Sequence, residues 1–132
     1  MKKPGAEPVF PVGFDDDALE EDLAHLPATA EKELRAFHAE LRRLGGIPKS
    51  RLIACQAEAR DGTRLGGCVK TYIPWPGGRF GAVFIAVTHP ARPLALRAIA
   101  FGIRHRPRGS SAPTVYEVAD KRLNSNELRS PN

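Results

Sequence analysis

The residues best suited to chemistry in this sequence lie in the run Arg104–Arg108, where three arginines alternate with His105 and Pro107. Arginine holds phosphate through paired hydrogen bonds, and histidine can exchange a proton near neutral pH. Upstream, Tyr72 and Trp75 stand beside a proline-rich turn. Their rings can either stack on nucleobases or cover the edge of a core. These residue types together indicate a partner with a phosphate chain.

The charge of the chain is divided unevenly. Residues 1–44 carry six Lys/Arg against ten Asp/Glu, a net charge of −4, whereas residues 45–132 carry fourteen against five, a net charge of +9. A basic surface attracts phosphate chains by releasing condensed counterions, and it can equally serve solubility or an acidic protein partner. With a calculated pI of 9.6, we expect RNA or another polyanion as the partner.

The spacing of cysteine and histidine argues against a metal site or a disulfide framework. Cys55 and Cys68 are too far apart for a CxxC pair, and the four histidines show no HxxxH spacing. We therefore expect reduced thiols, no metal and no other cofactor. No apolar run is long enough to cross a bilayer or to form a signal peptide, which predicts a cytoplasmic protein.

A length of 132 residues predicts one domain. We expect a flexible tail at 1–8, a single α+β domain at 9–123 and a polar tail at 124–132. In the first part, Val9–Phe14 suits an edge strand because proline lacks the N–H that a central strand needs. Asp15–Asp17 favour the start of a helix at about 16–26, and Thr29 can cap a second helix at 29–44 that ends at Gly45 and Gly46.

The second part of the chain predicts the sheet. Strands are expected at 51–58, 67–73, 80–88 and 94–103, with turns at Asp61-Gly62, at 74–78 and at 89–93. The last two strands are nearly continuous apolar runs, which indicates central strands covered on both faces. A last helix is expected at 114–123. The two N-terminal helices form a hairpin whose apolar faces need a sheet to cover.

Four strings in this order resemble the RelE/ParE superfamily of bacterial toxins. They are Gly67–Lys70, which leads into a strand, Phe80–Phe84, Phe101–Arg106, and Val115–Leu123. The resemblance implies an N-terminal helical hairpin packed on a curved antiparallel sheet, with a short C-terminal helix. It also implies cleavage of messenger RNA, on the ribosome or free, and an acidic antitoxin protein as partner.

The resemblance assigns the family's functional residues to Lys70, Arg104 and Tyr116. This chain departs from the family at two positions. Tyr72 stands where RNA-cleaving members have a second lysine, and Gly81 stands where they have an arginine. Arg79 is close enough in sequence to substitute for that arginine.

Cleavage of RNA by its own 2′-oxygen needs a base, stabilisation of negative charge on the phosphate and a proton for the leaving oxygen, and it needs no metal. Lys70 and Arg104 would supply charge, to which Arg79 or Arg106 can add. His105 suits proton transfer because histidine has a reference pKa near neutrality, whereas that of tyrosine is about 10. In an extended strand, however, His105 would point away from Arg104, so it qualifies only if the strand has ended.

Each of these residues has a structural alternative. Lys70 and Arg79 can be solvated strand residues, the arginines at 104, 106 and 108 can bind phosphate without catalysis, and Tyr116 can be a half-buried helix residue. The residues expected to bind nucleic acid are Arg106, Arg108, Lys121, Arg122, Tyr72 and Trp75. Three functions stay open: a RelE-like endoribonuclease, a member of the same fold that only binds nucleic acid or a target such as DNA gyrase, and an accessory protein of a mobile element.

Overall fold

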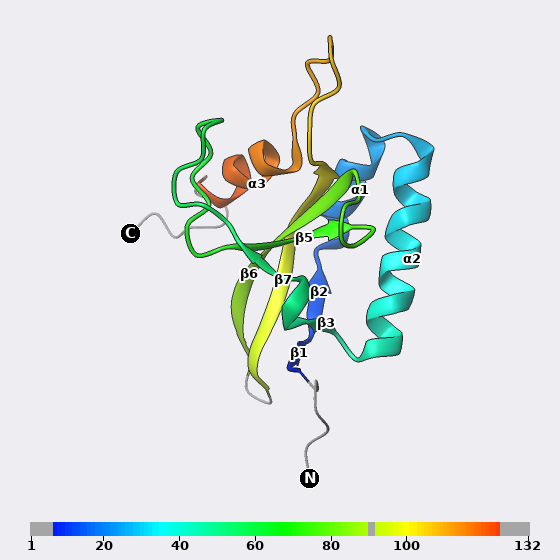
Figure 1. Ribbon diagram of the computed structural model, residues 1–132, viewed down its shortest axis with the longest axis vertical. Coiled ribbons are helices and arrows are strands. Elements are labelled where there is room, and N and C mark those ends of the chain that lie inside the picture. Colours follow the sequence, from blue (N-terminus) through cyan, green and yellow to red (C-terminus); the bar gives the residue numbers. More distant parts are fainter. Residues whose placement is uncertain (1–6, 90–91, 125–132) are drawn as a thin grey trace.

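In the described part of the chain, five strands form one mixed sheet: β2 (Val12–Phe14), β4 (Ile53–Ala54), β5 (Val69–Ile73), β6 (Phe80–His89) and β7 (Arg92–Ile103). Their order across the sheet is β2-β7-β6-β5-β4. A separate two-stranded sheet pairs β1 (Val9–Phe10) with β3 (Ile47–Pro48). The computed structural model describes residues 7–89 and 92–124, and Figure 1 shows how these elements are arranged.

Within the residues that the structure describes, three α-helices accompany the sheet, so the fold is mixed α+β. They are α1 (Asp16–Ala24), α2 (Ala28–Leu44) and α3 (Val115–Leu123), and a 3-10 turn, η1 (Lys49–Arg51), follows β3. In residues 7–89 and 92–124, no helix is both long and apolar enough to cross a membrane. The expected tails lie mostly outside the described residues, but the carbonyl of Pro8 accepts the Lys49 N–H at 2.9 Å.

One edge of the sheet differs from the prediction. β2 pairs with β7 in parallel, whereas β4, β5, β6 and β7 pair antiparallel. The expectation of an antiparallel sheet is therefore wrong at this edge, because the path of the chain through α1 and α2 decides the direction of β2 and a hydrophobic pattern does not encode it. Val12–Phe14 lies at the edge as predicted, and Pro11 divides the expected strand into β1 and β2.

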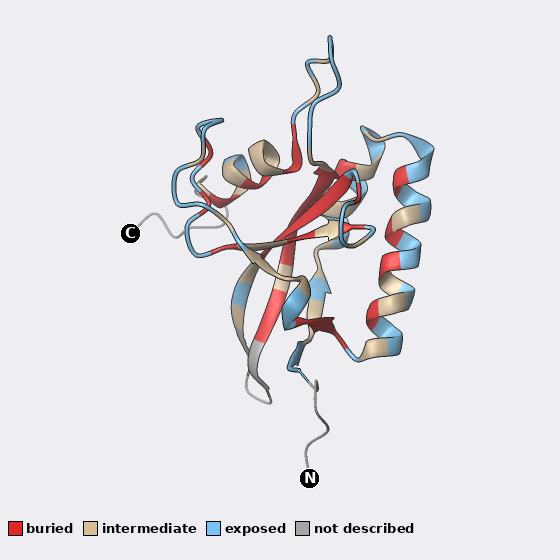
Figure 2. Ribbon diagram, in the orientation of Figure 1, coloured by how far each residue is buried: buried red, intermediate tan, exposed pale blue. Residues whose placement is uncertain are grey.

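The central strands are buried over residues 80–84 of β6 and 98–102 of β7 (Figure 2), whereas Ala86 further along β6 is exposed. A first core cluster joins the buried side of α2 to one face of the strands, through residues such as Phe37, Phe84 and Leu96. A second core cluster joins α3 to the other face, through Val83, Ile99, Ala100, Val115, Ala119 and Leu123 among others. A register shift at Val83/Phe84, which face Ala100 and Ala98, lets both Ile99 and Ala100 join the second cluster. The continuous apolar runs are explained by this double coverage.

The helix ends follow local chemistry with one exception. The Ala18 N–H donates to Asp15 Oδ1 at 3.1 Å, which caps α1, and Gly45 ends α2 in the left-handed region at φ 81°. The prediction that Thr29 caps the second helix is wrong, because α2 already begins at Ala28 after Pro27 and has no side-chain cap. At α3, Thr114 and Glu117 form a capping box.

The strand expected at 51–58 is reduced to β4, because η1 takes up the residues before it. Beyond β4 the chain leaves the ladder in a long loop that returns at β5. The turn predicted at Asp61-Gly62 lies within this loop, where Asp61 Oδ1 accepts the backbone N–H of Thr63 at 3.0 Å. The other strands begin and end within a few residues of their expected positions.

Candidate nucleic-acid interface

The interface is built first on β5, which presents Lys70 and Tyr72 on one face because alternate strand residues share a face. Lys70 lies opposite Val83, a member of the second core cluster, so this is the face covered by α3. The Lys70 Nζ lies 4.7 Å from the ring centre of Tyr116 on α3 and 5.8 Å from that of Tyr72. Both distances are within the range of a cation–π contact.

Arg104 reaches the same face from the end of β7. Its Cζ lies 3.5 Å from the centre of the Tyr72 ring, and its Nη1 donates to the carbonyl of Gly78 at 2.7 Å. The side chain passes over Gly81, where an added Cβ would lie 3.2 Å from Arg104 Cγ. Glycine at this position therefore leaves room for the guanidinium to lie on Tyr72.

The turn between β5 and β6 completes the site. Trp75 stacks on Tyr72 with ring centres 5.9 Å apart and an interplanar angle of 21°. A Cβ at Gly78 would overlap the backbone of Ile73, so only glycine allows the turn to fold back this closely. The carbonyl of Gly78 is thereby placed to hold Arg104. We call Lys70, Tyr72, Trp75, Arg104 and Tyr116 the cation–aromatic cluster.

The cations of this cluster are not neutralised by carboxylates in the described part of the chain. Neither Lys70 nor Arg104 makes an ion pair there, and the buried Nε of Arg104 has no hydrogen-bond partner among those residues. Contact with aromatic faces orients the two cations without neutralising their charge. The cluster therefore brings two positively charged side chains and three partly buried aromatic rings together.

No family model, curated protein or solved structure matches the chain. The function is therefore inferred from the geometry of the site.

The residues predicted for catalysis divide into two groups. Lys70, Arg104 and Tyr116 meet in the cation–aromatic cluster, whereas Arg79 and His105 line an open cleft of about 1090 Å³. The cleft lies beside the end of β7 and is bordered by α1, α3 and the loop after β7. Its other lining residues include Leu26, Ile103, Val118 and Lys121.

His105 qualified for proton transfer beside Arg104 only if the strand had ended before it. β7 ends at Ile103, so His105 is not held to a strand face. Its exposed side chain nevertheless borders the cleft, while Arg104 turns onto Tyr72. Proton transfer within the cluster would therefore fall to Lys70 or Tyr116.

The basic residues outside the cluster differ in how they are engaged. Arg106 pairs with Glu117 at 2.5 Å, and the pKa of Glu117 is lowered, first by the hydrogen bond from the Thr114 N–H and then by that from Arg106. Arg108 and Lys121 are exposed and make no ion pair within residues 7–89 and 92–124. These two can contact phosphate without first breaking an ion pair.

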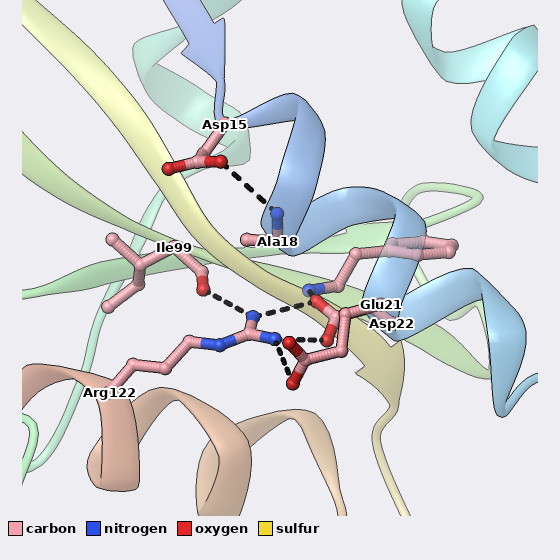
Figure 3. A network of polar contacts seen from close by, with 7 residues as sticks. Asp15, Ala18, Glu21, Asp22, Ile99 and Arg122 are labelled. Carbon is pink, nitrogen blue, oxygen red and sulfur yellow. Dashed lines mark hydrogen bonds and ion pairs between the residues drawn. The ribbon is translucent and has the colours of Figure 1, made fainter.

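Arg122 was expected to bind nucleic acid, but its guanidinium is directed into the protein (Figure 3). It donates to both carboxylate oxygens of Asp22, at 2.7 and 2.9 Å, and to the carbonyl of Ile99 at 2.8 Å. Asp22 Oδ2 also accepts the Phe101 N–H at 2.9 Å, so this carboxylate joins α1, β7 and α3. The Arg122 side chain is only 15% exposed, so its charge is already engaged by these contacts within the protein.

Ion pairs across the fold join the basic part of the sequence to the acidic part. Three arginines of the basic part pair with acids of the first 44 residues: Arg51 with Glu40, Arg97 with Asp15, and Arg122 with Asp22. The hydrogen bond from Arg51 lowers the pKa of Glu40. Folding thus neutralises some of the arginines of residues 45–132 with acids of residues 1–44. The positively charged surface is therefore smaller than the net charge of +9 suggests.

Sequence reasoning missed the roles of two glycines in this site. Gly81 was noted as a departure from the family pattern and Gly78 as part of a turn, yet one makes room for Arg104 and the other holds its guanidinium. The sequence did contain one sign of the role of Gly78, namely two adjacent glycines at 77 and 78 after a proline-rich stretch. They indicate a close approach of the backbone, but not what the turn would contact.

Proposed function

We propose that this protein is a RelE-like RNA-binding protein that contacts single-stranded RNA with the cation–aromatic cluster and cleaves it there without a metal ion. The observation that carries the proposal is the meeting of Lys70 and Arg104 with three aromatic rings on one face. Neither cation is neutralised by a carboxylate within the described residues. Binding and cleavage are separate parts of the proposal and are tested separately.

The binding part rests on matched chemistry. Lys70 and Arg104 would face the negative phosphates. Trp75, the ring of the cluster over which no cation lies among the described residues, offers a surface on which an unpaired base can stack. Stacking of one base on an aromatic side chain contributes about 1–3 kcal/mol and tolerates any sequence. Bases in a duplex are already stacked on one another, so this surface favours single strands.

The cleavage part assigns roles within the same cluster. The 2′-oxygen of one nucleotide attacks the adjacent phosphorus, the bond to the 5′-oxygen breaks, and the products are a cyclic phosphate and a 5′-hydroxyl end. Lys70 and Arg104 stabilise the extra negative charge on the phosphoryl oxygens. Tyr116 or Lys70 exchanges protons with the attacking and leaving oxygens.

The proposal also includes the arrangement that the RelE/ParE resemblance implies, a helical hairpin packed on a curved sheet, and an acidic antitoxin protein as partner. Support for a helical hairpin on a sheet comes from α1, which contacts β7, and from the buried residues of α2 in the first core cluster. An acidic antitoxin that covers the basic face and a cytoplasmic location follow from the same proposal, because charge complementarity speeds the encounter of such partners.

A second candidate is a protein of this fold that binds without cutting. It is favoured by the place of His105, which borders the cleft and not the cluster. It is also favoured by the hydrogen bond that Arg104 Nη1 donates to the Gly78 carbonyl, because this bond uses one of the guanidinium N–H donors. Such a protein would inhibit its target by occupying it.

The binding test is a titration of single-stranded RNA followed by fluorescence anisotropy. For two phosphate contacts, one each from Lys70 and Arg104, the affinity should fall about 7-fold between about 50 and 200 mM salt, since the slope is about −0.7 per contact on single strands. Lys70→Ala should weaken binding, and Lys32→Ala, an exposed lysine on α2, is the matched control. An affinity that is independent of salt would end the RNA proposal.

The cleavage test uses end-labelled RNA with a chelator present, both alone and on translating ribosomes. Cutting should stop when the 2′-hydroxyl at the cut site is replaced by hydrogen. Wild-type protein that binds RNA but cuts under neither condition would leave the binding-only function. Cutting that survives removal of the 2′-hydroxyl would contradict the mechanism.

A further inference from the structure

Cys55 and Cys68 lie directly opposite each other at one edge of the sheet. β4 and β5 pair Ile53 with Lys70 and Ala54 with Val69, and the next step of this register brings Cys55 to Cys68. The backbone confirms that step, because the Cys55 N–H donates to the Cys68 carbonyl at 3.0 Å. Neither residue is in a disulfide in this structure.

The geometry of such a pair suits a covalent bond. The Cys55 N–H donates to the Cys68 carbonyl, whereas the Cys68 N–H donates to the carbonyl of Leu65. Directly opposite residues of antiparallel strands have Cα atoms about 4.5–5.5 Å apart, and their side chains project to the same face. A disulfide typically joins Cα atoms about 4.4–6.8 Å apart. Both side chains also belong to the second core cluster, Cys68 as a buried member and Cys55 packed against it.

We propose that Cys55 and Cys68 are a modification site that closes into an intrachain disulfide when it meets a small disulfide such as oxidised glutathione. The Cys55 thiolate attacks one sulfur of the oxidant and releases one glutathione thiolate, which takes up the Cys55 proton. The Cys68 thiolate then attacks the Cys55 sulfur of the mixed disulfide and releases the second glutathione, which takes up the Cys68 proton. Two protein thiols are oxidised and one oxidant disulfide is reduced to two thiols.

The accessibility of the two thiols sets the order and the rate. Cys55 is half-buried and Cys68 is 3% exposed, so the external oxidant meets Cys55 first. Burial and the neighbouring Cys68 raise the pKa of Cys55 to about 11, against a smaller opposing effect of Lys70. Since the thiolate is the reacting form, oxidation should be slow near neutral pH and should speed up about tenfold per pH unit below that pKa.

The bond would tie the edge of the sheet to the strand that carries the cation–aromatic cluster. Cys68, Lys70 and Tyr72 follow one another on the same face of the chain. The link would also close the loop 56–67, which reduces the freedom of the unfolded chain and should raise the thermal midpoint by roughly 10 °C. This inference does not depend on RNA binding.

The test is oxidation of the folded protein with oxidised glutathione at alkaline pH, followed by peptide mapping without reduction. We expect peptides containing Cys55 and Cys68 to be linked within one chain, the two thiols to resist alkylation after unfolding in denaturant, and dithiothreitol to reverse both changes. Cys55→Ser should yield no linked peptide, and Cys68→Ala should stop at the mixed disulfide on Cys55. If Cys68→Ala does not fold, the map of the wild type decides alone.

Three results would overturn the inference. They are two thiols that remain open to alkylation after oxidation, a wild-type protein that stops at the mixed disulfide, and a disulfide that joins two chains.

Discussion

Arg104→Ala removes the guanidinium that lies 3.5 Å from the Tyr72 ring centre and donates to Gly78 at 2.7 Å. If this guanidinium also holds a phosphate, its loss removes one charged hydrogen bond to RNA. Such bonds contribute about 1.5–3 kcal/mol, which corresponds to roughly 10-fold to 150-fold in affinity. The slope of affinity against salt should shrink by about 0.7, the value of one contact on a single strand.

Arg104→Lys separates charge from geometry. Lysine keeps the positive charge, so the salt slope should stay near that of the wild type. It lacks the planar fork that bonds to Gly78 and the flat surface that stacks on Tyr72, so affinity should still fall. A change in affinity without a change in slope would thus indicate that Tyr72 and Gly78 orient the arginine for its ligand.

The assay is anisotropy of a labelled single-stranded RNA at several salt concentrations, with Lys32→Ala as the control. Thermal unfolding of each variant is measured alongside, because the bond to Gly78 and the contact with Tyr72 together stabilise the fold by about 1–3 kcal/mol. A folded Arg104→Ala protein that binds RNA with the affinity and salt slope of the wild type would refute the proposed site.

Three further predictions follow from the contacts of other residues. Asp22→Ala leaves Arg122 buried without its main partner and should lower the free energy of unfolding in urea by about 3–5 kcal/mol. The double variant Asp22→Leu with Arg122→Met should lower it by less, because no buried charge is left unpaired. Equal losses for the two variants would contradict this reasoning. Because the pKa of Glu117 is lowered in the folded protein, this carboxylate stabilises the protein at pH values above the ordinary glutamate pKa of 4.5, and the stabilisation is lost as the pH falls through the lowered pKa. Glu117→Gln should therefore flatten the acid limb of stability against pH, and an unchanged limb would exclude this effect. His105→Ala should leave the rate of RNA cleavage within about twofold of the wild type, whereas Lys70→Ala should lower it about 100-fold. A larger loss in His105→Ala than in Lys70→Ala would indicate that cleavage takes place in the cleft lined by Arg79 and His105.

Much of the fold was determined by local patterns in the sequence. The apolar runs that became β6 and β7, the glycine end of α2, the acidic start of α1 and the helix after Thr114 were all predicted to within a few residues. These features depend on neighbours in the chain, such as a capping side chain, a glycine at positive φ or a run of apolar residues. The choice of Lys70, Arg104 and Tyr116 came instead from the resemblance of four strings to a family of toxins.

Tertiary structure alone decided which charges remain available and where the site lies. Arg104 and Arg122 are both arginines of the basic part, yet one lies on Tyr72 and the other is held by Asp22, from a helix far away in the sequence. The parallel direction of β2 and the separation of His105 from Arg104 were likewise decided by packing. The physical reason is the same in each case: partners distant in sequence meet only when helices and strands pack, and neither charge nor periodicity along the chain records which partner a side chain will meet.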